Sequence, residues 1–329
     1  SSTILMPHHR PGMQQWCFTT AWGDALHMSG ETWNSAGVDA ALRQLGREVA
    51  EFLQSEDMTG AVSARVIDAP ELPVFSFHEE EVFPAASLYK LAVMMAFCRE
   101  VDHGVLEPSA LVDLSPADRA QGPTGLAILE DMVRISWRDL VRLMMSISDN
   151  AAAEAVLRKV RTSRVHETLH LMGAMRTEIR PTPPSGNGAP ASFDDEGRDR
   201  YLMPDPVEYD PLSVSSTTAS DLVTLLCAIW QDRAASAEQC AFMRQVLSQQ
   251  AWGHRFAEAF SYPGVTVAAK TGSFGSLSHE AGVVSHPGEK SIAVAVLTRS
   301  VRRERQIPLS NKVVGQIARH CVRNYRQFL

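Results

Sequence analysis

The chain lacks any long hydrophobic run and any excess of basic residues. Among its 329 residues, no apolar stretch approaches the roughly 18 residues that a membrane-spanning helix needs. The formal net charge is −7, so the surface offers no positive field to a phosphate backbone. We therefore expect no membrane span and no nucleic-acid partner.

Cysteine is scarce and follows no pattern. The five cysteines are scattered, form no C-x-x-C pair and do not cluster with histidine at metal-ligand spacing. They predict reduced, mostly buried thiols and no metal site, and no motif indicates a cofactor. The first residues also lack a basic segment followed by an apolar one, so no signal peptide is visible. The thiols and the missing signal slightly favour a cytoplasmic location.

The residues that are present suit a soluble globular protein with a sizeable core. The apolar fraction is 45% and the charged fraction 21%, and the length suffices for one large domain or two closely joined ones. Apolar residues recur at helical spacing over 38–56, 137–146, 150–160, 165–172, 219–230, 237–248 and 311–325. Strand-like stretches occupy 61–67, 72–77, 265–269, 281–284 and 292–298.

The order of these elements predicts an α/β (α+β) fold of two lobes. An antiparallel sheet flanked by N- and C-terminal helices is expected from residues 38–84 and 250–329. Residues 85–249 would form an all-helical lobe inserted between the two parts of that sheet. Residues 1–37 are irregular and are interpreted as an N-terminal extension. A ligand site is expected in the cleft between the two lobes.

Three short motifs occur in order along the chain: S-x-x-K at Ser87 and Lys90, S-D-N at 148–150, and K-T-G at 270–272. A lone S-x-x-K carries little weight, because about one is expected by chance in a chain of this size. The other two are each expected at roughly a tenth of that rate or less. The first opens an apolar helix, the second separates two helices and the third ends an apolar strand. The combination therefore indicates a catalytic site.

The chemistry of these residues is that of an activated serine. A serine hydroxyl is a weak nucleophile until a base removes its proton, and Lys90 lies one helical turn from Ser87 on the same face. Lys90 can be that base only if burial and a second cation, Lys270, lower its pKa. The helix N-terminus also favours negative charge at Ser87. Asp149 is expected to act as the N-cap of the helix that begins at 150.

With these motifs the sequence resembles the class A β-lactamases and the penicillin-binding proteins, from about residue 38 to the C-terminus. The resemblance implies a β-lactamase-like fold, with Ser87 as nucleophile and Lys90, Ser148 and Lys270 as its catalytic partners. Ser148 would pass a proton to the leaving nitrogen. The backbone N–H groups of Ser87 and Ser273 would form the oxyanion hole. Members of this family are usually exported, so the compartment stays open.

The resemblance also implies a substrate-binding edge. Asn150 would hold the acyl side chain of a small-molecule substrate and touch the lysine. A substrate carboxylate would meet Thr271, Gly272 and Ser273, and His279 on the next strand falls about where the family places a cation for it. The oligomeric state is left open.

One family feature is missing. Class A enzymes carry a Glu-x-x-Leu-Asn segment whose glutamate activates the deacylating water, and this chain has none. Counting back from the threonine pair at 217–218 places Leu202 at the glutamate position. Glu208, Asp210 or Glu280 could substitute as the second base. Acylation is thus better supported than hydrolysis.

Three functions remain open from the sequence. One is a serine hydrolase of cyclic amides, similar to a β-lactamase. Another is a D,D-peptidase, esterase or acyltransferase that uses the same Ser87 chemistry on another substrate. The last is a binding or sensor module that is acylated once and then stops.

Overall fold

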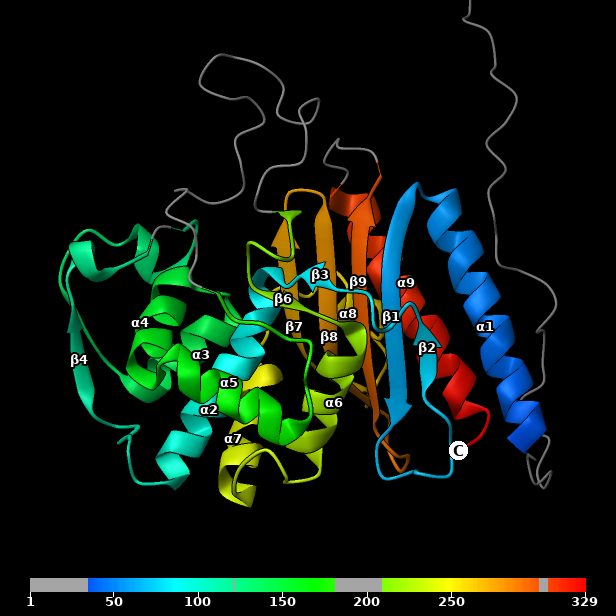
Figure 1. Cartoon of the computed structure of the whole chain (residues 1–329), viewed down its shortest axis with the longest axis horizontal. Helices are drawn as coiled ribbons and strands as arrows, with labels where there is room; N and C mark the ends of the chain where they lie inside the picture. Colours follow the sequence, from blue (N-terminus) through cyan, green and yellow to red (C-terminus); the bar gives the residue numbers. More distant parts are fainter. Residues whose placement is uncertain (1–34, 121, 181–208, 302–306) are drawn as a thin grey trace, which may run out of the picture. The chain divides into compact units, whose positions relative to one another are not determined.

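A five-stranded antiparallel sheet joins the two ends of the chain (Figure 1). The computed structural model describes residues 35–120, 122–180, 209–301 and 307–329. The strand order is β2-β1-β9-β8-β7. The strands are β1 (Met58–Val66), β2 (Phe75–Phe77), β7 (Thr266–Phe274), β8 (Leu277–Ser285) and β9 (Ile292–Ser300). Because β1 pairs with β9 along its whole length, the sheet expected from both ends of the sequence is confirmed.

One face of the sheet is covered by α1 (Ser35–Ser55), α8 (Phe256–Ala259) and α9 (Ile307–Arg326). α1 buries the apolar positions that recur every three or four residues in its sequence, from Val38 to Leu53. Tyr325 of α9 fixes this layer to the sheet. Its hydroxyl accepts a hydrogen bond from Phe75 N at 2.6 Å and lies 2.9 Å from Ala64 O.

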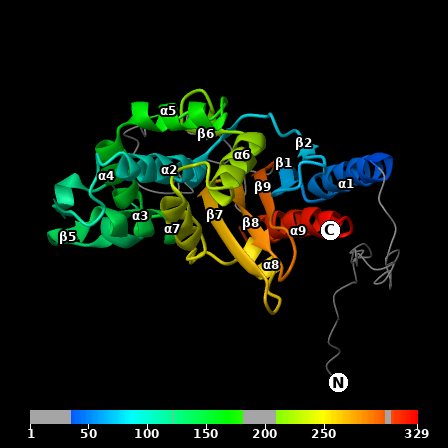
Figure 2. The same cartoon turned by 90° about the horizontal axis from the view of Figure 1, so that it is seen from below.

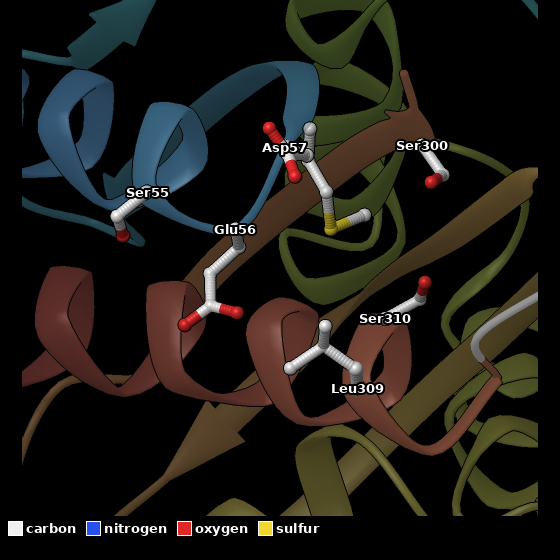
Figure 3. Close-up of a pocket in the computed structure, with 7 residues that line it drawn as sticks. Ser55, Glu56, Asp57, Ser300, Leu309 and Ser310 are labelled. Atoms are coloured by element: carbon white, nitrogen blue, oxygen red, sulfur yellow. The ribbon is translucent and has the colours of Figure 1, made fainter. Parts of the chain in front are cut away.

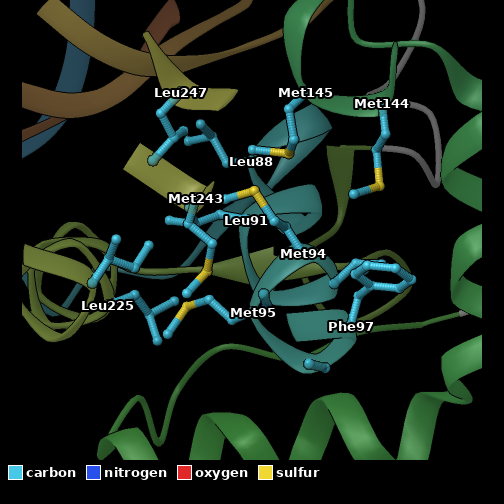
Figure 4. Packing of buried hydrophobic residues seen from close by; sticks show 14 of the residues in the cluster. Leu88, Leu91, Met94, Met95, Phe97, Met144, Met145, Leu225, Met243 and Leu247 are labelled. Atoms are coloured by element: carbon cyan, nitrogen blue, oxygen red, sulfur yellow. The ribbon is translucent and has the colours of Figure 1, made fainter. Parts of the chain in front are cut away.

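The helices from the middle of the chain are α2 (Tyr89–Asp102), α3 (Trp137–Ser146), α4 (Asn150–Val160), α5 (Thr162–Met172), α6 (Ala219–Trp230) and α7 (Ala237–Leu247). Of these, α6 contacts β1, β8 and β9 on the other face of the sheet and α7 contacts β7, while the rest pack on these two helices and on one another (Figure 2). α2 is buried on all sides from Lys90 to Cys98, as expected of a helix that is apolar around its circumference. Methionines of α2, α3 and α7 meet around it in the core, as Figure 4 shows for Met95, Met145 and Met243.

The helical region also contains two short two-stranded sheets. β4 (Leu111–Leu114) pairs with β5 (Val133–Ser136), and β3 (Phe83–Pro84) pairs with β6 (Ser216–Thr217). Short 3₁₀ helices η1 (Ala86–Leu88), η2 (Pro116–Asp118) and η3 (Gly125–Ile128) connect the larger elements. Strands of two to four residues are too short to show periodicity, so the sequence did not predict them.

Three further features bear on the sequence predictions. Within the described ranges, no helix has an apolar stretch long enough to cross a bilayer. The four cysteines in these ranges are buried and form no disulfide, as predicted for them: Cys98, Cys227, Cys240 and Cys321. A pocket of about 200 Å³ lies between the C-terminal end of α1 and the start of α9, lined by residues such as Glu56, Ser300 and Leu309 (Figure 3). It contains no residue of the three motifs.

Candidate active site

The candidate nucleophile lies on a strained turn that leads into the buried helix. Ala86, the residue before Ser87, has a φ of +45°, and Ser148 of the S-D-N motif has a φ of +59°. Residues other than glycine rarely adopt this left-handed backbone conformation, which costs about 1–3 kcal/mol for each residue. Ser87 is partly exposed, whereas Lys90, one turn later, is fully buried. A left-handed backbone at Ser148 and at the residue before Ser87 is typical of a functional site.

Lys90 is bound by the S-D-N motif. Its Nζ donates hydrogen bonds to Ser148 O at 2.7 Å, Ser148 Oγ at 3.2 Å and Asn150 Oδ1 at 2.8 Å. Burial lowers the pKa of Lys90 to about 7, although the charge of Asp149 acts in the opposite direction. A sizeable fraction of the amine is therefore neutral near pH 7 and able to accept a proton.

Asp149 holds the S-D-N loop in place. Its Oδ1 accepts a hydrogen bond from Ala152 N at 3.1 Å, which confirms the predicted N-cap of α4. Its Oδ2 accepts another from Leu126 N at 2.7 Å. Gly125 has a φ of +65°, and a Cβ there would lie 2.1 Å from Asp149 Oδ2, so only glycine fits. This carboxylate therefore positions the loop and is not free for proton transfer.

The K-T-G motif lies within the edge strand β7, against the nucleophile turn. A Cβ on Gly272 would lie 3.1 Å from Leu88 Cγ and 3.2 Å from Ala85 O, so the glycine allows the strand to approach this closely. Lys270 is fully buried and donates a hydrogen bond from Nζ to Thr271 O at 2.7 Å. Burial and then the neighbouring Lys90 hold the pKa of Lys270 well below its usual range. The three motifs thus meet around Lys90.

His279 does not supply the cation expected for a substrate carboxylate. It is fully buried opposite Gly272, and its Nδ1 accepts a hydrogen bond from Thr298 N at 3.1 Å. Its Nε2 lies 3.1 Å from Pro84 O and donates to that carbonyl. Burial lowers the pKa of His279 to about 4, so the ring is neutral at physiological pH. This prediction from the sequence is corrected, because both ring nitrogens serve the backbone.

Arg255, which the sequence did not single out, provides a cation at this end of β7. Its guanidinium donates to Gly272 O at 3.1 Å, to Ser273 Oγ at 2.6 Å and to Asn311 Oδ1 at 2.8 Å. Burial lowers the pKa of Arg255 to about 10, which leaves the group charged at neutral pH. Arg255 is only 2% exposed, but Ser273 is exposed. No pattern in the sequence points to Arg255, because it belongs to no motif and precedes a helix of four residues.

Glu280 lies on the wrong face of the sheet for a deacylation base. Lys270 is paired with Ala281, which packs in the core shared with the middle helices. Because side chains alternate along a strand, Glu280 points to the opposite face. It is 1% exposed, and its Oε2 accepts a hydrogen bond from Phe256 N at 2.8 Å. This part of the sequence prediction is therefore also corrected.

The other acids proposed for deacylation do not change this result. Asp210 is exposed, and its carboxylate closes its own turn by accepting from Leu212 N at 2.9 Å and Ser213 Oγ at 2.7 Å. Glu208 and Leu202 lie outside the described residues.

Comparison with known proteins agrees with the fold. Residues 44–325 match the family model of the beta-lactamase enzyme family, and the chain belongs to this family. It is 25% identical over 310 residues to the beta-lactamase regulatory protein BlaB of Streptomyces cacaoi, covering 86% of this chain and 97% of BlaB.

Solved structures show the same fold. The β-lactamase of Sphaerobacter thermophilus superposes with a TM-score of 0.70 at 24% identity, covering 90% of this chain and 99% of that one. A leucine-to-glutamate mutant of PBP-A, solved as an acyl-enzyme complex with penicillin G, gives a TM-score of 0.71 at 18% identity, covering 88% and 97%. The fold is thus that of β-lactamases and penicillin-binding proteins.

The role of Asp149 can be tested by stability. We expect Asp149→Ala to lower the free energy of unfolding by about 2 kcal/mol or more, because it removes a helix cap and leaves the buried Leu126 N–H without its acceptor. Urea denaturation measures this change. Ser136→Ala, which removes the cap of α3 and the hydrogen bond from Ser136 Oγ to Asp139 Oδ2, serves as the control and should cost about 1 kcal/mol. Equal losses in the two variants would contradict a second role for Asp149.

Proposed function

We propose that this chain is a serine hydrolase of the β-lactamase type that forms an acyl-enzyme at Ser87 with lactams or related amides and esters. The observation that supports it most is the environment of Lys90: fully buried, bound by Ser148 and Asn150, and with a pKa of about 7. An amine in that state one turn from a serine hydroxyl has the properties of a general base.

The proposed step is an acyl transfer. Ser87 Oγ attacks the substrate carbonyl while Lys90 accepts the hydroxyl proton, and negative charge develops on the carbonyl oxygen. The backbone N–H groups of Ser87 and Ser273 are the candidate donors to that oxygen. The carbon–nitrogen bond then breaks, and Ser148, which already contacts Lys90, passes the proton to the leaving nitrogen. The product is an ester at Ser87.

The substrate is expected to carry a carboxylate. Thr271 and Ser273 are two residues apart and therefore lie on the same face of β7. Arg255 donates a hydrogen bond to the Ser273 hydroxyl. That bond leaves the Ser273 proton available to an anion at an exposed position. Arg255 therefore takes the role that the sequence analysis gave to His279.

The ester is expected to persist. Hydrolysis needs a second base that directs a water at the ester carbonyl. Among the described acids proposed for this task, Asp210 closes a turn and Glu280 faces away. The ungapped count places Leu202 where class A enzymes have glutamate. PBP-A, of similar fold, has been solved as an acyl-enzyme with penicillin G in its leucine-to-glutamate form, so this fold accommodates an ester-bound penicillin.

A second candidate function is regulatory. The chain is 25% identical to a protein described as a beta-lactamase regulatory protein, and that similarity covers almost all of the relative. A chain that is acylated once and keeps the adduct would suit a sensor. A permanent adduct favours this sensor, slow release of the product favours the proposed hydrolase, and rapid ring opening without an adduct favours a β-lactamase with fast turnover. Reaction only with unrelated esters or D-Ala-D-Ala peptides favours the peptidase, esterase or acyltransferase alternative.

The nucleophile is tested by mass. After incubation with benzylpenicillin, the wild-type protein should gain the mass of the intact lactam, and Ser87→Ala should gain none. Loss of one partly exposed hydroxyl removes little packing, so the free energy of unfolding of the variant should stay within about 0.5 kcal/mol of that of the wild type. An adduct of the same size and rate on Ser87→Ala would show that another residue is the nucleophile.

The acylation rate should rise with pH. Neutral Lys90 is the active base, and its pKa of about 7 sets the half-maximal rate near pH 7. Below pH 6 the rate should fall about tenfold per pH unit, because the protonated amine cannot accept the serine proton. Adduct formation timed by intact mass from pH 5 to pH 9 measures this profile. A rate that is constant or falls with rising pH would exclude Lys90 as the base.

Release of the adduct should depend on the residue at position 202. We expect Leu202→Glu to speed hydrolysis of the penicilloyl ester by about 10²–10⁴-fold, the usual contribution of a general base. Decay of the adduct mass after removal of free lactam gives the rate. Leu202→Gln, of similar shape without the basic carboxylate, is the control and should not speed release. Rapid release by the wild-type protein would contradict the proposed persistence.

A further inference from the structure

Glu280 is a buried acid that the acylation chemistry does not use. It lies on β8 directly opposite Thr271 of the K-T-G motif, on the face covered by α8 and α9. The sheet separates it from Lys270, whose side chain points to the other face. Burying a carboxylate is unfavourable unless its oxygens are bound, so its presence at 1% exposure needs an explanation.

The contact that Glu280 makes is with the backbone next to Arg255. Its Oε2 accepts a hydrogen bond at 2.8 Å from the N–H of Phe256, the first residue of α8. Arg255 is the preceding residue and has φ −128° and ψ −95°, which lies outside both the helical and the extended regions. The side chain of Arg255 does not cap this helix, and Glu280 instead supplies the acceptor for its first N–H.

The backbone conformation at Arg255 sets the position of its guanidinium group. From this position the guanidinium reaches Asn311 Oδ1, Gly272 O and Ser273 Oγ, the last at 2.6 Å. Of these three residues, Ser273 is the one that is exposed to solvent. Burial raises the pKa of Glu280 to about 7, and in its ionised form Glu280 raises the pKa of Arg255 against the effect of burial. If the Arg255 backbone moved, the guanidinium would lose its hydrogen bond to Ser273 Oγ.

We propose that Glu280 is a positioning residue for recognition of the substrate carboxylate: by binding Phe256 N–H it fixes Arg255, which in turn orients and polarises the Ser273 hydroxyl. The inference rests on the proposed acylation of Ser87. It differs from a purely structural role in its consequence. A structural role lowers the reactivity of every substrate alike, whereas a positioning role lowers it only for substrates that carry the anion.

The test compares benzylpenicillin with its methyl ester, which lacks the carboxylate charge. The rate constants for acylation of Ser87 are measured by intact mass for the wild type, Glu280→Ala and Glu280→Gln. Glu280→Ala should slow the acid by about tenfold or more and the ester by less than about twofold, the loss expected for a contact to a charged group. Glu280→Gln keeps an oxygen for Phe256 N–H and should preserve the preference for the acid.

A matched control is Asp221→Ala. Asp221 is also a buried acid that accepts a backbone hydrogen bond, from Arg176 N at 2.9 Å, but it lies on α6. Its loss should change both rate constants by the same factor. Equal loss for acid and ester in Glu280→Ala, or no loss for either, would overturn the proposal. So would a Glu280→Gln variant that behaves like Glu280→Ala.

A second measurement does not depend on acylation. In the wild type Arg255 Nε–H donates to Asn311 Oδ1 at 2.8 Å in a buried setting, so its NMR signal should exchange slowly with solvent. Glu280→Ala should lose this protection, while Glu280→Gln and Asp221→Ala should keep it. If neither lactam acylates the wild type, the proposed function fails, and this signal still decides the role of Glu280. Unchanged protection in Glu280→Ala would overturn the positioning role.

Discussion

The burial of the Lys90 ammonium is the constraint on which the rest of the site depends. A cation removed from water is tolerated only when its protons find acceptors, and three oxygens of the S-D-N motif provide them. These oxygens must therefore stay fixed against α2. Asp149 and Gly125 hold them there, and the left-handed backbone at Ser148 follows from the same requirement.

The edge strand β7 keeps two groups of charges apart. On the face toward the middle helices lie Lys270 and, close to it, Lys90, whose like charges lower the proton affinity of Lys270 beyond the effect of burial. On the other face Arg255 lowers the pKa of Glu280 and Glu280 raises that of Arg255, so each favours the charged form of the other against the effect of burial. The alternation of a strand thus separates the lysines suited to proton transfer from the arginine suited to anion recognition.

The candidate catalytic residues and the acids near the site have different surroundings. The parts needed to acylate a serine come together in the structure, while the described acids near the site are engaged in structural contacts. The proposed function therefore concerns acylation, which is the first half of a hydrolytic cycle.

The sheet, most of the helices and the three motifs could be predicted from the sequence, because helical and strand periodicity and the motif residues are local properties. The N-cap role of Asp149 could be predicted as well, since it depends only on the adjacent helix start. The cation at the end of β7 and the face that Glu280 occupies became known only from the folded structure. Arg255 reaches Ser273 from a distant segment, and His279 is neutral because it is buried, so neither result could be inferred from neighbouring residues. The pairing register of β7 and β8 places Lys270 and Glu280 on opposite faces of the sheet.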